Sequence, residues 1–322
     1  MSHSRTACNR RRGGNVEDGV LSNSAPRPTG PVVGRAVPSP PRSTKHPRLI
    51  IVGSSNTDLV IQCDRLPQPG ETLLGGEFAR FAGGKGANQA VAAARAGACV
   101  TFIGAHGNDD FGRAAKTELR REGIDVRYFR EHRQIPSGVA LILIGGRNRQ
   151  NQIAVARSAN DTLSGADIRA ARAVFRQADA VVAQLEIPLA AVQAAAELAV
   201  AAGIPFILNP APARKLPAKL LRLVDTLTPN EHEVRMVGQG ARRTVVTLGA
   251  RGVLIGKQRI PAPKVKPVDT VGAGDCFTAW LAVGIAEGLK LEDAARRAVR
   301  AASIAVTRPG AQPGMPYRRE SR

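Results

Sequence analysis

The chain has 322 residues, of which 46 are lysine or arginine and 26 are aspartate or glutamate, giving a formal net charge of +20. A chain of this length can bury a core that is stable without disulfide bonds. Aromatic residues make up only 3% of it, which argues against a stacking surface for single-stranded nucleic acid. The four cysteines form no CxxC pair, so we expect neither a zinc site nor a disulfide framework, and a reducing, cytoplasmic setting. The longest apolar stretch, Leu189 to Leu208, is interrupted by polar residues, glycine and proline, which excludes a membrane span.

Residues 1–48 are expected to form a disordered, basic tail. They contain nine basic and two acidic residues, a net charge of +7, and seven prolines that interrupt any apolar period. The Arg-rich, acid-poor composition resembles a targeting peptide, but no amphipathic helix or apolar core follows its first arginines. We therefore favour a tail without targeting function, or a misassigned start codon, over a targeting peptide.

From Leu49 onward, short apolar runs alternate with helical patterns. The run Leu49–Val52 ends at Gly53 and predicts a buried parallel strand. Further along the chain we expect helix 87–96, strand 100–103, helix 111–122, strand 180–184, helix 189–202, strands 206–208, 226–228 and 244–247, and helices 275–287 and 291–307. Strands separated by helices imply right-handed crossovers. The predicted fold class is therefore α/β, with a mostly parallel central sheet and helices on both faces.

Four alternating segments outside this series predict a second, smaller sheet. They are bounded by proline and glycine turn signals. The segments are 59–63, 72–81, 139–144 and 152–156. We expect residues 49–322 to form one α/β domain with an inserted β lid, built mainly from residues 57–82 and 137–157.

The segment most informative about chemistry is Val268–Thr278, which reads VDTVGAGDCFT. Gly272, Ala273 and Gly274 lead directly into an apolar-periodic helix, whose first-turn amides and positive dipole end attract phosphate oxygens. Asp275 stands in this turn, where a carboxylate can act as a general base toward a substrate hydroxyl. The residues alone leave a second interpretation open, a tight turn in which Asp275 only caps the helix. The segment is not a P-loop, because the Gly-Lys-Ser/Thr ending is missing.

This segment resembles the C-terminal signature of the carbohydrate kinase family that contains ribokinase, fructokinase and adenosine kinase. GGKGANQA at 83–90, preceded by PGET at 69–72, resembles the N-terminal sugar-binding signature of that family. Other similar segments follow in the family's order between about Leu49 and Pro316: GSSNTD at 53–58, QLE at 184–186, NPAPA at 209–213, TPNE at 228–231, TLGARG at 247–252 and AVTRPGAQP at 305–313. Several separated motifs in one order are more specific than any single motif.

The resemblance implies an ATP-dependent sugar kinase, with D-ribose the expected sugar and its 5-hydroxyl the acceptor. Asp275 would take the hydroxyl proton, and the amides of Gly272, Ala273 and Gly274 would stabilise the transferring phosphoryl group. The residues implied in sugar binding are Asn56, Thr57, Asp58, Gly84, Lys85, Gly86, Ala87, Asn88, Glu186 and Asp275. The residues implied in ATP binding are Asn230, Thr247, Leu248, Gly249, Ala250, Arg251, Gly252, Gly274 and Asp275.

Taken one at a time, these residues have simpler interpretations. The glycines of 83–86 fit a flexible turn before a helix, and Asp58 or Glu186 alone fits a helix cap or a surface charge. Residues 247–252 fit a plain turn between two strands. The motifs together favour the functional interpretation.

The same resemblance implies two cation sites. Glu233 would order waters around Mg²⁺, although Asn230 and Glu233 alone also fit a helix N-cap with a first-turn acid. A monovalent cation, expected to be K⁺, would lie beside the anion-binding turn. Its ligands would be Asp269, the carbonyls of Val271, Ala305, Arg308 and Gly310, and the position of Gly314. Gly314 has only a backbone to offer, so a side-chain ligand of the family would be missing there.

One departure from the family lies between Glu233 and Thr244. Only the ten residues 234–243 intervene, where the family normally has an additional helix. We expect a two-turn helix here, a crossover barely long enough for a parallel strand pair, and a sheet face left partly bare. Lower stability, a partner that covers this face, or a deletion in the gene model would each fit. ATP binding is therefore less secure than sugar binding.

Other functions stay open at this point. One is a non-catalytic sugar-binding or regulatory protein on the same fold, and another is a kinase for fructose or adenosine. A third hypothesis, that the protein binds nucleic acid, is supported by the basic charge alone and is not favoured. Since two lids pack together in proteins of this family, a homodimer through the lid is the expected assembly.

Overall fold

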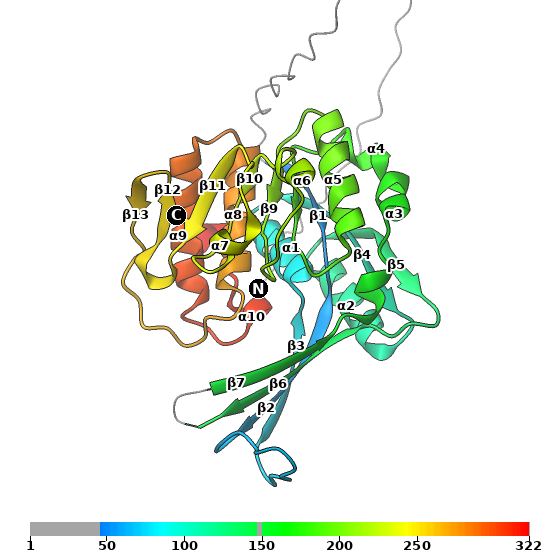
Figure 1. The fold of residues 1–322 in the computed structure, drawn as a ribbon, viewed down its shortest axis with the longest axis vertical. Coiled ribbons are helices and arrows are strands. Elements are labelled where there is room, and N and C mark those ends of the chain that lie inside the picture. Colours follow the sequence, from blue (N-terminus) through cyan, green and yellow to red (C-terminus); the bar gives the residue numbers. More distant parts are fainter. Residues whose placement is uncertain (1–45, 147–149, 322) are drawn as a thin grey trace, which may run out of the picture.

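The computed structural model describes residues 46–146 and 150–321, so nearly all of the predicted tail at 1–48 lies outside the described residues. The described part contains a nine-stranded central sheet with the order β13-β12-β11-β10-β9-β8-β1-β4-β5 (Figure 1). Its strands are β1 (Arg48–Val52), β4 (Cys99–Gly107), β5 (Asp125–His132), β8 (Ala180–Ala183), β9 (Phe206–Leu208), β10 (Thr226–Leu227), β11 (Arg243–Thr247), β12 (Val253–Ile255) and β13 (Gln258–Ile260). Pairing is parallel from β5 to β11, and β12 and β13 add an antiparallel edge.

Helices cover both faces of this sheet, and each face has its own hydrophobic core. Strand β1 supplies both, since Leu49 and Ile51 pack into one core while Ile50 and Val52 pack into the other. The first face carries α1 (Lys85–Arg95), α2 (Asp110–Arg121), α8 (Ala273–Ala286) and α9 (Leu291–Ala305). The second face carries α3 (Gly165–Ala170), α4 (Arg172–Phe175), α5 (Leu189–Ala201), α6 (Ala218–Leu221) and α7 (Glu233–Val237). The short elements α10 (Ala311–Gly314), η1 (Ser158–Thr162), η2 (Gly249–Arg251) and η3 (Arg318–Ser321) complete the described chain.

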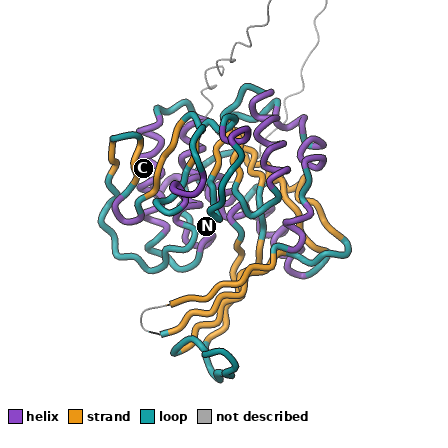
Figure 2. The backbone as a smooth tube through the Cα atoms, viewed as in Figure 1, coloured by secondary structure: helices purple, strands orange, loops and turns teal. Residues whose placement is uncertain are grey.

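The smaller sheet extends away from the layered body, as Figure 2 shows. It consists of β2 (Asn56–Cys63), β3 (Glu77–Gly83), β6 (Gly138–Gly145) and β7 (Gln150–Ala156), in the order β3-β2-β6-β7. The α/β class and the small sheet are thus confirmed. Within the described residues, no helix has the length and apolar character needed to cross a membrane.

The helix in the crossover after β10 is shorter than expected. Helix α7 has five residues, not two full turns, and it ends at Gly238. Strands β10 and β11 still pair in parallel. On the face of β11 and β12 that an additional helix would cover, Val246 and its cross-strand partner Leu254 are only half-buried. The expectation of a partly bare sheet face is therefore met at these two residues.

Candidate active site

Helix α8 begins in the turn that the sequence singled out. Gly272 is its N-cap residue, in a left-handed conformation with φ of 77°, and a Cβ there would lie 2.8 Å from the Cβ of Ala311. Only glycine tolerates both conditions. A Cβ built at Gly274 would meet no atom within 4 Å, so the space beside this residue is open. The Ala273 amide donates to the Thr270 carbonyl at 3.3 Å, and the first turn of α8 is therefore open on the side of Gly274.

Asp275 lies in this turn, 5% exposed. Its two carboxylate oxygens accept hydrogen bonds from Asn88 Nδ2 at 3.0 Å and from Gln89 Nε2 at 2.9 Å. No side chain caps α8, so the interpretation of Asp275 as a mere helix cap is wrong. A buried carboxylate held by two neutral amides keeps lone pairs free for a substrate proton.

A chain of amide side chains orients Asp275. Gln89 is fully buried, accepts a hydrogen bond from Gln184 Nε2 at 2.6 Å and also donates to Asn209 Oδ1 at 3.2 Å. Gln312 donates to Asn88 Oδ1 at 3.2 Å. None of these four residues, Gln89, Gln184, Asn209 and Gln312, is among the predicted site residues. Each lies within or next to a quoted motif, and a polar residue on the buried side of an apolar helix is the signal that identifies Gln89.

A polar pocket of about 230 Å³ opens in front of Asp275. It is lined by Lys85 from the start of α1, by residues 272–275, and by Asn230, Glu233 and Thr247 from the opposite side. Sequence-predicted residues from the sugar, nucleotide and metal sets therefore meet in one pocket. The carboxylate of Asp275, ahead of those of Glu186 and Glu233, raises the pKa of Lys85. The ammonium group therefore stays charged in the pocket.

Glu186 and Asp58, two of the predicted sugar-binding residues, lie near Lys85, which lines this pocket. The Oε2 atom of Glu186 accepts hydrogen bonds from Ser54 Oγ at 2.6 Å and from the Lys85 amide at 2.9 Å. Burial, and then the carboxylates of Glu186 and Asp275, raise the pKa of Asp58 to about 6, against the effect of Lys85. A Cβ at Gly83 would lie 2.3 Å from the Asp58 carboxylate. Neither acid is a surface charge, and the lid meets the body at Asp58.

The remaining predicted sugar residues divide into two groups. Asn56 Oδ1 accepts from Asn160 Nδ2 at 2.8 Å, and a Cβ at Gly84 would lie 2.7 Å from the Asn56 amide nitrogen. These two residues therefore pack closely against each other. Side chains alternate along a strand, so Thr57 lies on the opposite face of β2 from Asn56 and Asp58. Ala87 packs into the core and Gly86 packs on Gly53, so both serve packing.

The predicted nucleotide loop, 247–252, connects β11 to β12. Its backbone is a turn closed by a hydrogen bond from the Leu248 amide to the Gly252 carbonyl at 2.8 Å. The plain-turn interpretation therefore describes its backbone correctly. Thr247 nevertheless lines the polar pocket, and the exposed Arg251 forms an ion pair with Glu231. Leu248, Gly249 and Ala250 carry no polar side-chain group, and none of them lines the pocket.

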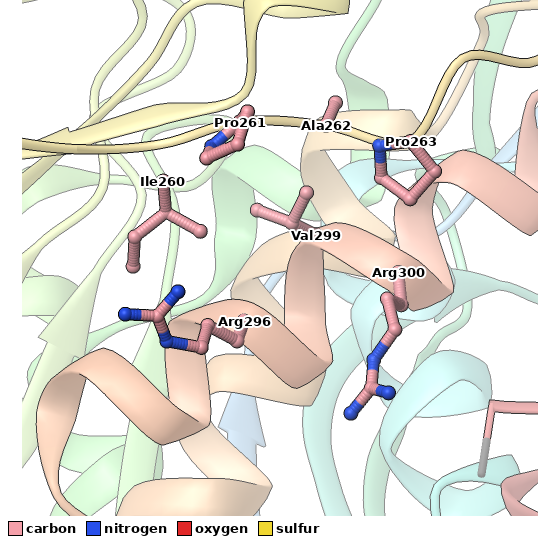
Figure 3. A pocket seen from close by; sticks show the side chains of 7 residues that line it. All are labelled: Ile260, Pro261, Ala262, Pro263, Arg296, Val299 and Arg300. Atoms are coloured by element: carbon pink, nitrogen blue, oxygen red, sulfur yellow. The ribbon is translucent and has the colours of Figure 1, made fainter.

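A second hollow, of about 450 Å³, lies beside the far end of this loop (Figure 3). Its walls are residues 260–263 and, on α9, Arg296, Val299 and Arg300. A Cβ at Gly252 would lie 2.0 Å from the Ile260 carbonyl oxygen, so the loop abuts this hollow. The loop therefore runs from the polar pocket to the second hollow.

Glu233 presents one carboxylate to the polar pocket. Its Oε2 atom accepts from the Asn230 amide at 2.8 Å, and Asn230 Oδ1 accepts from the Glu233 amide at 2.8 Å. These reciprocal bonds are those of a capping box, so the capping interpretation is confirmed. Burial raises the pKa of Glu233. No group of three or more metal-ligating side chains occurs in the described residues.

The residues predicted to hold a monovalent cation lie together. The Asp269 carboxylate accepts from the amides of Val271 at 3.0 Å and Gly310 at 2.9 Å. A Cβ at Gly314 would lie 3.0 Å from the Ala305 carbonyl oxygen and 3.6 Å from that of Arg308. Carbonyl and carboxylate oxygens suit a hard cation. These oxygen atoms are therefore suitable ligands for a monovalent cation, although Gly314 contributes no side chain.

Comparisons with known proteins agree with this geometry. A family model described as "pfkB family carbohydrate kinase" matches residues 46–318. Ribokinase of Bacillus subtilis (strain 168) is 40% identical over 291 residues, which cover 84% of this chain and 97% of that protein. Ribokinase of Haemophilus influenzae is 38% identical over 296 residues, covering 85% and 96%. The structure of Arabidopsis thaliana ribokinase complexed with ribose and ATP has a TM-score of 0.77 at 32% identity, covering 86% of this chain and 97% of that one. The chain therefore belongs to the pfkB family of carbohydrate kinases.

Proposed function

We propose that this protein is a ribokinase, which transfers the γ-phosphoryl group of ATP to the 5-hydroxyl of D-ribose. The observation that carries the proposal is the buried Asp275 carboxylate, held by Asn88 and Gln89 at the open first turn of α8. The chain's similarity to the ribokinases of two bacteria and to the plant ribokinase with bound ribose and ATP supports this choice of substrates.

The described residues suggest how the reaction proceeds. Ribose lies among Asn56, Asp58 and Glu186, whose amide and carboxylate groups bond to its hydroxyls. Asp275 accepts the proton of the 5-hydroxyl as its oxygen attacks the γ-phosphorus. The amides of residues 272–275 and the ammonium of Lys85 stabilise the charge of the phosphoryl group in flight. Positioning and electrostatics therefore supply the catalysis.

Two ions complete the proposal. Mg²⁺, held through water by Glu233 and by the phosphates, would offset the charge of the nucleotide. K⁺ would sit on Asp269 and on the carbonyls of Val271, Ala305, Arg308 and Gly310, behind the first turn of α8. The donor chemistry of both sites supports these assignments.

Release of ADP, coupled to a reporter enzyme, tests the proposal. The full chain is assayed with D-ribose, fructose or adenosine in Mg²⁺, with and without K⁺. We expect ribose-dependent turnover that K⁺ stimulates. Turnover with fructose or adenosine but not ribose would reassign the substrate. Ribose binding in a calorimeter without any turnover would instead favour a non-catalytic sugar-binding protein.

The lid supports a homodimer. On the face opposite Asp58, the cross-strand neighbours Ile61 and Phe78 are 39% and 67% exposed, and Leu141 is 56% exposed. Apolar side chains gathered on one exposed sheet face mark an interaction surface. A second copy of the lid matches this surface in size and character. Phe78→Glu should convert a dimer to a monomer in analytical ultracentrifugation, whereas the rim substitution Glu77→Gln should not.

A cytoplasmic location is part of the same proposal. The enzyme needs ATP, and the described residues contain no disulfide bond. Both conditions suit a reducing compartment rich in ATP.

A further inference from the structure

Asn160 lies where the lid returns to the body of the molecule. Strand β7 ends at Ala156, and the chain then turns through Ser158, whose φ is 47°. Asn160 follows in η1 and is only 1% exposed. An asparagine buried to this degree needs partners for both polar atoms of its amide group. Its three side-chain hydrogen bonds all go to residues 55 and 56, where the chain enters β2.

The main chain of Ser55 fixes the direction in which the Asn160 amide points. The Ser55 amide donates to Asn160 Oδ1 at 2.9 Å, and the Ser55 carbonyl accepts from Asn160 Nδ2 at 3.2 Å. A main-chain N–H can only donate, and a main-chain carbonyl can only accept. The oxygen and nitrogen of the Asn160 amide therefore cannot exchange places without the loss of two buried hydrogen bonds.

The orientation of Asn160 in turn fixes that of Asn56. Asn160 Nδ2 also donates to Asn56 Oδ1, at 2.8 Å. A Cβ at Gly138 would lie 2.2 Å from Asn56 Oδ1 and 2.3 Å from Asn160 Nδ2, so a glycine leaves room for the paired amides. A reversed Asn56 amide would place two NH₂ groups against each other, with no acceptor between them. Asn56 Oδ1 is therefore held toward Asn160, and Nδ2 is turned away from it.

Asn56 Nδ2 is left as a hydrogen-bond donor without a partner. Asn56 is 6% exposed, and its Nδ2 donates to no atom of residues 46–146 or 150–321. A buried donor without a partner costs free energy, and a ligand that accepts its hydrogen bond offsets this cost. Asp58, an acceptor, lies two positions further along β2 and on the same face. A hydroxyl group both accepts and donates, so a sugar satisfies both residues.

We propose that Asn160 is a positioning residue for sugar recognition, which holds Asn56 so that its Nδ2 donates to a hydroxyl oxygen of the sugar. The inference rests on the proposed function and names a residue that determines the specificity of the same site. The main chain at Ser55 orients Asn160, and Asn160 decides which atom Asn56 presents to the sugar. Asn160 acts through Asn56 and does not itself contact the sugar.

Asn160→Asp tests the proposal, in the full chain and with folding checked by thermal melting. A carboxylate still accepts from the Ser55 amide but cannot donate, so Asn56 turns Nδ2 toward it and presents Oδ1 to the sugar. We expect the KM and the calorimetric Kd for ribose to rise about ten- to a hundredfold, with kcat and the KM for ATP within about threefold of the parent's. Unchanged ribose constants in the folded variant would overturn the proposal. Asn108→Asp makes the same exchange at an exposed asparagine that bonds to Arg113, and should change none of these constants.

A double-mutant cycle separates positioning of Asn56 from simple support of the main chain. In an Asn56→Ala background, Asn160→Asp should change the ribose Kd by less than about twofold, because the group through which it acts is gone. Additive effects of the two substitutions would show that Asn160 only supports the turn at Ser55, which contradicts the proposal. Asn160→Ala provides the same cycle without a buried carboxylate, should Asn160→Asp fail to fold. Its ribose Kd should rise about three- to tenfold, since the Asn56 amide is released and not reversed.

Failure of this proposal differs from failure of the proposed function. Ribose-dependent turnover in the parent, together with an unchanged ribose Kd in Asn160→Asp, leaves the ribokinase assignment standing and removes the inference about Asn160. Absence of both ribose binding and turnover in the parent removes the ribokinase assignment, and the inference with it.

Discussion

The proposed sugar and nucleotide sides of the active site are built in opposite ways. On the sugar side, the buried Asn88 and Gln89 both donate hydrogen bonds to the buried Asp275, and Gln184 and Asn209 extend the network into the sheet. On the nucleotide side, Asn230 and Arg251 are exposed, and their side chains bond only to neighbours on the same surface. The crossover that borders this side is also the short one.

This difference predicts how each side responds to substitution. Buried polar groups that satisfy one another are costly to disturb, since a lost partner leaves a desolvated group unpaired. Exposed charged and polar groups can replace a protein partner with water at little cost in free energy. Substitutions on the sugar side should therefore change turnover and stability together, while those on the nucleotide side should change only the KM for ATP.

The largest effect is expected at Asp275. Asp275→Asn removes the proton acceptor and should lower kcat by about 10² to 10⁴. The amide keeps the size of the side chain, so ribose should still bind with a Kd within about tenfold of the parent's, measured by calorimetry. Near-normal turnover would exclude Asp275 as the general base and place the catalytic group elsewhere in the pocket.

Asp58 links sugar affinity to pH. Its pKa is raised from the usual 3.8 to about 6, so the folded protein binds this proton more tightly than the unfolded chain does. The carboxylate therefore costs stability as pH rises through 6, and this cost is absent below pH 4. Asp58→Asn should be more stable than the parent at pH 8 by about 1 to 3 kcal/mol, and equally stable at pH 4. Its KM for ribose should rise about tenfold or more, because a charged acceptor is lost.

Thermal melting at the two pH values provides the control for Asp58. The gain in stability must disappear at low pH if it arises from this carboxylate. An Asp58→Asn variant with an unchanged KM for ribose would separate Asp58 from the sugar site and leave it a role in the lid alone.

Contiguous motifs explain why much of the site could be predicted. Residues 83–88 and 272–275 are each one local segment, whose glycines and charges are visible without the fold. The amide network could not be predicted in the same way. Gln89 and Gln184 are 95 positions apart, and Gln89 and Asn209 are 120 apart, so only the packing of α1 on the sheet brings them together.

The strands of the central sheet also divide into those that the sequence predicts and those that it does not. Strands with long apolar runs, such as β1, were predicted because burial on both faces leaves a strong pattern. Strands β5 and β13 lie at the two edges of the central sheet, where β5 reads DVRYFREH and β13 reads QRI. Edge strands are half-solvated and carry charges. Their patterns therefore resemble those of loops, and both strands were missed.

Gln89 tests the buried network itself. Gln89→Met fills a similar volume but removes one hydrogen bond each from Asp275, Gln184 and Asn209. We expect a loss of about 1 to 3 kcal/mol in the free energy of unfolding and about a tenfold drop in kcat. The KM for ribose should change little, which separates a positioning role from sugar binding. Gln193→Met, on the solvent side of α5, is the matched control and should leave both quantities unchanged.

Arg251 tests the opposite side and should give the smallest effect. Its ion pair with Glu231 lies at the surface, where such pairs contribute about 0 to 1 kcal/mol. Arg251→Ala should therefore raise the KM for ATP by no more than about fivefold, with kcat, the KM for ribose and the melting temperature unchanged. The increase should shrink further at high salt, because exposed charges are screened. A hundredfold loss of kcat in this variant would mean that Arg251 contacts the transferring phosphoryl group. The nucleotide side would then take part in catalysis as directly as the sugar side does, despite its exposure.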